Sequence, residues 1–295
     1  MTTVHFEETM DGLVIDRISR DHDFSMPTKH FHNEYEIYYL ISGDRYYFID
    51  KETYYCPAGS LVLVEHNLVH KTSTVQIPSH DRILLEIHGE ILKPLMDLIG
   101  ISIEDFFHQY TGVYVLPSNK QQKVEKLLLS IAHEIKSRSE NYDFIAKLKV
   151  MELLIFVMRY DAIQKPTPIP NKARTDKHNL VDKVATYLSD TYDKNETLED
   201  ISKKFFVNKC YLSRIFKEVT GFTISEYTNI YRIQKAKSML DESDVSITEI
   251  AETLGFRSAA YFVRVFKNYT ETTPHHYRKQ LQTYKDQRRE RRLEH

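Results

Sequence analysis

The sequence predicts an α+β multidomain protein, with a strand-rich N-terminal domain that ends in a helical hairpin and an all-α C-terminal domain. Two observations support this fold class. Residues 4–88 are rich in Tyr, Ile, Val and Phe and contain turn residues at Gly43 and Gly59, which is typical of β-strands. From residue 118 onward apolar residues recur at helical spacing, beginning with Val124, Leu127 and Leu128.

A proline-rich stretch separates the two domains. Pro166, Pro168 and Pro170 lie in a polar segment, and proline lacks an amide donor and disfavours a helix before it. This predicts an extended linker. We therefore expect a strand-rich domain at 1–117, a helical hairpin at 118–160, a linker at 161–177 and a helical domain at 178–284. The final residues, 293–295, resemble the start of a vector-derived histidine tag and are left out of this division.

Composition and charge narrow the function classes. The chain has 295 residues and only two cysteines, which excludes a disulfide framework and favours a reducing, cytoplasmic compartment. Residues 1–10 lack the apolar stretch of a signal peptide, and we expect no membrane span. Residues 1–171 hold 17 Lys and Arg against 24 Asp and Glu, whereas residues 172–292 hold 23 against 17. A basic C-terminal part weakly favours a polyanionic partner there.

The hairpin has two possible roles. Its first helix carries an apolar stripe that runs from Val124 to Ile135, and a second helix is expected from about Asp143 to Tyr160. The pair could cover the sheet or form a dimer interface, and the sequence does not favour either.

An internal repeat dominates the C-terminal domain. Residues 211–217 match residues 261–267 at an offset of 50, with apolar residues at i, i+3, i+4 and i+7 in both copies. Each copy follows a shorter helix that begins with a capping pattern, at Thr197 and, as a full capping box, at Ser246. Asn208 and Ser258 are suitable N-caps for the second helices.

Two short helices joined by a tight turn, the second one basic on its exposed face, form a helix-turn-helix. The helix expected between the copies, Thr223–Leu240, spans roughly 27 Å. The two second helices could then lie about 34 Å apart, one turn of B-DNA. A plain helical domain with solvated Arg and Lys is the alternative, and two copies in identical phase favour DNA.

Residues 178–280 resemble the DNA-binding domain of AraC-type regulators. The second unit matches through Gly255-Phe256, Tyr261-Phe262, Arg264, Phe266-Lys267, Thr273-Pro274 and Tyr277-Arg278; the first matches through Tyr211-Leu212-Ser213-Arg214, Phe216-Lys217 and Gly221; and the connecting helix matches through Arg232, Ala236 and Leu240. Two positions depart from the family pattern. Glu271 stands where the family usually has a glycine that ends the helix, and Ile224 lies near a position that is often aromatic.

The resemblance implies which residues contact DNA. Base-facing positions fall on Cys210, Ser213, Arg214, Ala259, Ala260, Val263 and Arg264, and phosphate-facing positions on Lys209, Lys217 and Lys267. Arginine is the side chain best suited to pair with guanine, and the alanines and Val263 could contact thymine methyl groups.

The N-terminal domain resembles a cupin barrel. His30, His32, Glu36 and Gly43 follow the spacing of the first cupin motif, and His70 ends a looser second motif. On one extended strand His30, His32, Glu36 and Tyr38 would point to the same side. We expect these residues and His70 to line a pocket for a small effector, with no cofactor. The alternative is that His30, His32, Glu36 and His70 bind a divalent metal.

These features predict a one-component transcription regulator rather than an enzyme. A small molecule, expected to be a carbohydrate because the barrel region is rich in tyrosine, would control binding to double-stranded DNA. The resemblance implies an activator that acts with RNA polymerase as a homodimer. Two alternatives remain: a metal-dependent cupin enzyme fused to a DNA-binding domain, and a nonspecific binder that contacts phosphates alone.

Overall fold

The computed structural model describes residues 1–24, 32–76, 78–161 and 175–293. The predicted linker prolines and His30 lie outside the described residues. The chain divides into two compact units, residues 1–179 with 219–221 and residues 180–218 with 222–295.

The first unit contains two antiparallel sheets. One has the strand order β1 (Thr2–Met10), β2 (Leu13–Arg20), β8 (His80–Ile87), β3 (Tyr35–Ser42), β6 (Ser60–Val64) and β9 (Gly112–Val115). The other has the order β5 (Glu52–Pro57), β4 (Asp44–Ile49) and β7 (His70–Thr74). Apolar side chains from both sheets form one buried cluster, so the sheets pack face to face. This confirms the predicted strand-rich N-terminal domain.

The central strands of the larger sheet are buried on both faces. Ile37 and Tyr39 of β3 pack toward the helices, whereas Tyr38 and Leu40 pack toward the smaller sheet. Alternate residues of a strand point to opposite faces, so Glu36 lies on the same side as Tyr38, between the sheets. This two-sided burial explains why β3 reads as a nearly continuous apolar run.

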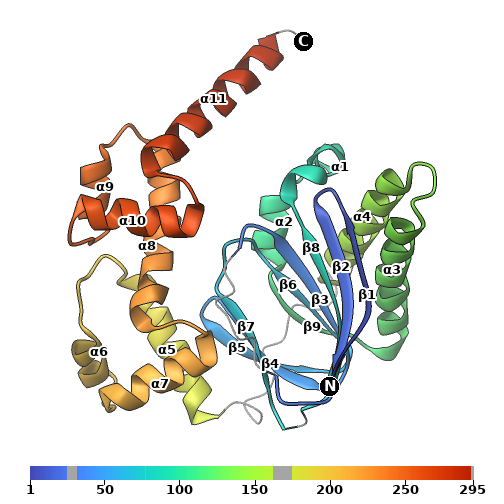
Figure 1. The fold of residues 1–295 in the computed structure, drawn as a ribbon, viewed down its shortest axis with the longest axis horizontal. Coiled ribbons are helices and arrows are strands. Elements are labelled where there is room, and N and C mark those ends of the chain that lie inside the picture. The colour runs from blue at the N-terminus through green and yellow to red at the C-terminus, as the bar shows by residue number, and fades with distance from the viewer. Residues whose placement is uncertain (25–31, 77, 162–174, 294–295) are drawn as a thin grey trace. The chain divides into compact units, whose positions relative to one another are not determined.

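Helices cover the outer face of the larger sheet (Figure 1). A short 3₁₀ turn (Gly89–Ile91) leads into α1 (Lys93–Ile99) and α2 (Ile103–Tyr110), and α3 (Ser118–Ser137) and α4 (Tyr142–Asp161) form the hairpin. The stripe from Val124 to Ile135 shares one buried cluster with Ile83 and Leu85 of β8. The hairpin therefore covers the sheet, and the first turns of α4 leave Phe144 and Leu148 exposed.

The second unit is helical throughout its described residues, which confirms the predicted all-α domain. Its helices are α5 (Asp176–Asp190, which begins in the first unit), α6 (Leu198–Lys204), α7 (Lys209–Thr220), α8 (Ile224–Glu242), α9 (Ile247–Thr253), α10 (Ala259–Thr270) and α11 (Pro274–Leu293). The helix α8 has 19 residues and is therefore about 28 Å long. Among the helices of the described segments, none is both long and apolar enough to cross a bilayer.

Candidate DNA-binding and sensor sites

The helices α7 and α10 bury equivalent apolar stripes. Leu212, Ile215 and Phe216 are buried in α7, as are Phe262, Val265 and Phe266 in α10. Both stripes match the sequence prediction. Because an apolar stripe fixes the rotation of a helix, the opposite face of each helix is exposed in the same phase.

Each exposed face presents an arginine beside a tyrosine. Arg214 and Arg264 are exposed, and each Cζ lies over the ring of the tyrosine three residues earlier, 5.7 Å from the Tyr211 centroid and 5.2 Å from the Tyr261 centroid. A cation over an aromatic face is attracted by the ring quadrupole. The same contact therefore orients both guanidinium groups away from the buried stripes.

The other predicted contact residues differ in their accessibility. Cys210, Lys217, Ala260 and Lys267 are exposed, whereas Ser213, Ala259 and Val263 are partly exposed. Ala259 and Val263 also pack against the apolar cluster of the second unit. Lys209 is exposed, with its Nζ 3.6 Å from a carboxylate oxygen of Glu199. Lys209 therefore forms an ion pair across the turn between α6 and α7.

Side chains cap the helices at the predicted residues, with one correction. The Asn208 side chain accepts the amide of Cys210 at 2.8 Å, and Ser258 Oγ accepts that of Tyr261 at 3.2 Å. Of the two shorter helices, however, α6 is the one with a full capping box, formed by the Thr197–Asp200 pair. Ser246 accepts only the Glu249 amide, at 3.1 Å, so the box predicted there is half formed.

Buried Arg232 ties the segment before α6 to the turn before α10. Its guanidinium donates to the carbonyl oxygens of Tyr192 at 2.6 Å and Lys194 at 3.0 Å, and it lies 5.2 Å from the ring centroid of Phe256. A Cβ at Gly255 would lie 2.0 Å from the carbonyl oxygen of Asp193. These contacts connect the two helix-turn-helix units through α8.

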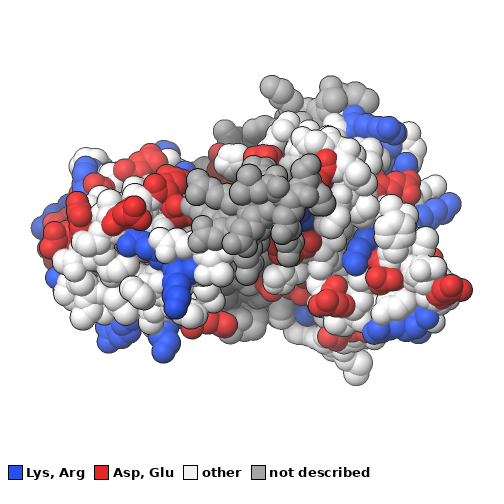
Figure 2. Space-filling model, turned by 90° about the horizontal axis from the view of Figure 1, so that it is seen from above, with Lys and Arg blue, Asp and Glu red and all other residues white. Residues whose placement is uncertain are grey.

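Charged side chains do not by themselves mark the DNA-binding surface. Figure 2 shows Lys and Arg interspersed with Asp and Glu on the face that it presents. The candidate DNA interface is therefore defined by individual exposed residues of α7 and α10 and not by a continuous basic patch on this face.

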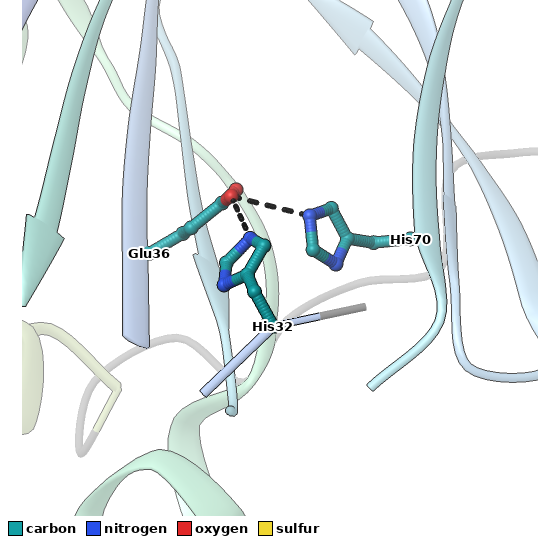
Figure 3. Close-up of side chains that lie close together, drawn as sticks. All are labelled: His32, Glu36 and His70. Carbon is teal, nitrogen blue, oxygen red and sulfur yellow. Dashed lines mark hydrogen bonds and ion pairs between the residues drawn. The ribbon is translucent and has the colours of Figure 1, made fainter. Parts of the chain in front are cut away.

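In the first unit, His32, Glu36 and His70 converge between the sheets (Figure 3). Glu36 Oε1 lies 2.7 Å from His32 Nε2 and 3.2 Å from His70 Nε2. The Tyr47 hydroxyl donates to the other carboxylate oxygen at 3.3 Å. Glu36, His70 and Tyr47 are at most 2% exposed, so this polar cluster is removed from water.

The two histidines keep the buried carboxyl group ionised. Burial opposes the charged form of Glu36, but the nearby His70 and His32 imidazoles lower the pKa of Glu36 well below its ordinary value. Burial also disfavours charged His32, yet its hydrogen bond and ion pair with Glu36 raise the pKa of the imidazole. The cluster therefore stabilises the ionised carboxylate of Glu36 between two imidazole rings.

One predicted feature of this cluster is wrong. The strand β3 begins at Tyr35, so His32 precedes it and does not share an extended strand with Glu36. A bend at residues 33–34 lets His32 reach Glu36 four residues later, which an extended strand does not allow. The amide of Asn67 donates to the His32 carbonyl oxygen at 2.8 Å and helps to hold the bend in place.

An open pocket of about 780 Å³ lies beside the cluster. Of the residues predicted to bind an effector, His32 lines this pocket, whereas Glu36, Tyr38 and His70 are buried and do not line it. The other polar side chains of the pocket come from β1, the β1–β2 turn, the segment before β3, the end of β8 with the residue after it, and the end of α3: Thr9, Asp11, Glu34, Glu86, His88 and Arg138.

Two family descriptions match the chain in the two units. "AraC-like ligand binding domain" matches residues 12–154, and "Helix-turn-helix domain" matches residues 201–280. The chain belongs to the AraC family. It is a transcriptional regulator with a ligand-binding domain and a helix-turn-helix DNA-binding domain.

Individual relatives cover different parts of this AraC-family chain. The melibiose operon regulatory protein of Escherichia coli K12 is 27% identical over 264 residues, which are 86% of this chain and 84% of that protein. The transcriptional regulator YtdP of Bacillus subtilis is 34% identical over 149 residues, 50% of this chain and 19% of that protein. Apo ToxT from Vibrio cholerae aligns with 94% of this chain and all of that chain, with 17% identity and a TM-score of 0.41.

The departure from the AraC-family pattern at Glu271 leaves the helix end unchanged. Glu271 takes the left-handed conformation at φ 60°, and α10 ends there as it would at a glycine. Phe206 is also left-handed. It has φ 55° in the turn of the first helix-turn-helix, and its side chain is 95% exposed.

Tyr47 belongs to the polar cluster around Glu36, but the sequence did not identify it. It appeared only among the many tyrosines of the region. Every second residue of β4 faces the larger sheet, and Tyr47 is one of them. This alternation along the strand could have identified Tyr47 from the sequence.

Proposed function

We propose that this regulator reads DNA sequence through Arg214 of α7 and Arg264 of α10. The observation that carries the proposal is their equivalence: both are exposed, both lie over a tyrosine, and both project from helices with equivalent buried stripes. A guanidinium group pairs with the two acceptors of guanine in the major groove. Lys209, Lys217 and Lys267 contact phosphates and fix the register.

The two helices read different chemistry. Cys210 and Ser213 give α7 polar groups beside its arginine, whereas the corresponding surface of α10 carries Ala259, Ala260 and Val263. Apolar groups discriminate mainly through the thymine methyl. Most of the hydrogen-bonded base recognition therefore comes from α7.

The test compares Arg214→Ala with Lys217→Ala on the full chain. Binding is measured to the DNA upstream of its own gene and to random DNA, at several salt concentrations. Loss of Arg214 weakens specific binding by about 1–3 kcal/mol and reduces the preference for the upstream DNA. Loss of Lys217 weakens binding to both DNAs and lowers the salt dependence.

Exposed Lys235 on α8 supplies the control, because Lys235→Ala removes one positive charge from the same domain. Unchanged affinity and selectivity in Arg214→Ala would contradict base reading by this residue. Equal affinity of the unaltered chain for both DNAs would instead indicate a nonspecific binder.

The small effector of this regulator is proposed to be a carbohydrate. The pocket beside His32 presents carboxylates, imidazoles and Arg138, which can hydrogen-bond to the hydroxyl groups of a sugar. Its volume of about 780 Å³ lies within the usual range for small-molecule sites. The name of the melibiose operon relative is consistent with this class.

A thermal-shift screen of the full chain with melibiose and other sugars tests the effector class. A sugar that binds the folded state raises the melting temperature by mass action. Glu86→Gln, which alters the pocket, should reduce this shift, whereas Glu90→Gln at an exposed position outside it should not. A screen in which no sugar shifts the transition would contradict a carbohydrate effector.

We also propose that the regulator is a cytoplasmic homodimer that activates transcription by RNA polymerase. Phe144 and Leu148 lie one turn apart on α4 and are 51% and 40% exposed, an apolar surface that a second copy could bury. Sedimentation of the double variant Phe144→Ser, Leu148→Ser should show monomers where the unaltered chain shows dimers. Dimers in both samples would place the interface elsewhere.

A further inference from the structure

We propose that His32, Glu36 and His70 bind one divalent transition-metal ion between the two sheets of the ligand-binding domain. This goes beyond the proposed function, since neither the base contacts nor the effector class requires a metal.

The three donor groups already converge on one point. One ligand atom from each residue lies within 4.8 Å of the others, and Glu36 Oε1 is 2.7 Å from His32 Nε2 and 3.2 Å from His70 Nε2. Two ligands of a tetrahedral zinc ion lie about 3.4 Å apart, given metal–ligand distances of about 2.1 Å. Small side-chain rotations would therefore let all three atoms contact a single ion.

The second nitrogen of each histidine also lies near an oxygen acceptor, within hydrogen-bond geometry for His70 and at ion-pair distance for His32. His70 Nδ1 lies 2.9 Å from the carbonyl oxygen of Leu68, which only accepts hydrogen bonds, so Nδ1 carries the hydrogen. His32 Nδ1 lies 3.2 Å from a carboxylate oxygen of Glu34. Histidines that bind metals usually direct their other ring N–H to a carbonyl or a carboxylate, which fixes the orientation of the ring.

These partners turn both Nε2 atoms toward the same carboxylate oxygen. When a divalent ion displaces any hydrogen from these positions, it can accept electron pairs from both imidazoles and from the carboxylate at once. Metal binding to such a site releases any protons held there.

The remaining oxygen of Glu36 is held as well. The Tyr47 hydroxyl donates to Oε2 at 3.3 Å, and this leaves Oε1 on the side of the two imidazoles. Tyr47 is fully buried, so its hydroxyl cannot exchange this contact for water. Tyr47 thus orients the carboxylate as outer-layer residues do in metal sites.

The ligand set also selects the kind of ion. Two imidazole nitrogens and one carboxylate oxygen suit Zn²⁺, Fe²⁺, Co²⁺ or Ni²⁺, whereas Mg²⁺ and Ca²⁺ prefer oxygen ligands. Three protein ligands leave at least one coordination position for a small molecule. Because His32 also lines the pocket, that position could be open to a molecule bound there.

The proposal is tested by measuring metal binding to the full chain. The protein is prepared without an added polyhistidine sequence and is first stripped of metal with a chelator. Co²⁺ is added while its visible absorption is followed, and Zn²⁺ is titrated by calorimetry. We expect one ion per chain. Glu36→Gln and His70→Ala should abolish this binding, and Tyr47→Phe should weaken it by about ten- to a hundredfold.

Exposed His133 on α3 provides the control, and His133→Ala should bind Co²⁺ as the unaltered chain does. Glu36→Gln keeps the size of the side chain, and its circular dichroism spectrum shows whether the fold is retained. Failure of the unaltered chain to bind either ion overturns the proposal, as does undiminished binding by folded Glu36→Gln. Since DNA is not part of the assay, the result is independent of the proposed base contacts.

Discussion

The turn before α10 contains a glycine whose replacement by any other residue should destabilise the fold. Gly255 has φ 73°, and a Cβ there would lie 2.0 Å from the carbonyl oxygen of Asp193 and 3.1 Å from Arg232 Nη2. The Asp193 carbonyl is backbone and cannot rotate away as a side chain can. We therefore predict that Gly255→Ala destabilises the DNA-binding domain by moving the segment that contains Asp193.

The magnitude follows from two contributions. A non-glycine residue in the left-handed region costs about 1 kcal/mol. Moving the segment also strains the hydrogen bonds from Arg232 to the carbonyl oxygens of Tyr192 and Lys194, and one such bond from a charged donor contributes roughly 2 kcal/mol. Losing one of the two gives a total destabilisation of about 3 kcal/mol, measured by urea unfolding followed with far-ultraviolet circular dichroism.

The turn of the first helix-turn-helix offers a matched control. Phe206 is also left-handed, with φ 55°, but its side chain is 95% exposed and loses no packing when removed. Phe206→Gly should relieve about 1 kcal/mol of backbone strain in the folded state. Part of this gain in stability is offset because glycine has more conformational freedom in the unfolded chain. We expect a net gain of about 0.5 kcal/mol. A destabilisation below about 1 kcal/mol in Gly255→Ala would refute the close-contact argument.

Two further predictions concern buried polar groups. Arg232→Met leaves two carbonyl groups without their donor, and in urea unfolding it should destabilise the DNA-binding domain by about 3 kcal/mol. As a control, Lys235→Met on the exposed side of α8 should change the free energy of unfolding by less than about 0.5 kcal/mol. Burial and the charge of Arg45 lower the pKa of His80 from 6.5 to about 4, so the folded chain keeps this imidazole neutral where the unfolded chain protonates it. Stability should therefore fall as the pH drops from about 6.5 to 4, by on the order of 2–3 kcal/mol, and the fall should be smaller in His80→Gln; equal pH profiles would contradict the assignment.

The features that the sequence predicted well are local ones. The buried stripes of α7 and α10 follow from apolar spacing within each helix, and the caps at Asn208 and Ser258 depend on residues two or three positions away. The polar cluster around Glu36 depends on distant segments. The Asn67 amide holds the bend at His32, and His70 and Tyr47 reach Glu36 only because the two sheets pack together. No spacing within the first motif contains that information.

The repeat in the DNA-binding domain also shows that spacing along the sequence does not fix every packing contact. The helices α7 and α10 begin 50 residues apart, but α6 and α9 begin 49 residues apart, so the second turn is one residue longer. A constant offset of 50 would pair Phe206 with Phe256, which is 5% exposed, and would predict a buried aromatic ring. In the structure Phe206 instead occupies the left-handed position of Gly255, since the Val207 and Phe256 amides make equivalent hydrogen bonds to Ser202 and Ala251 at 3.0 and 2.9 Å. A single added residue therefore decides which aromatic ring packs inside the domain and which projects into solvent.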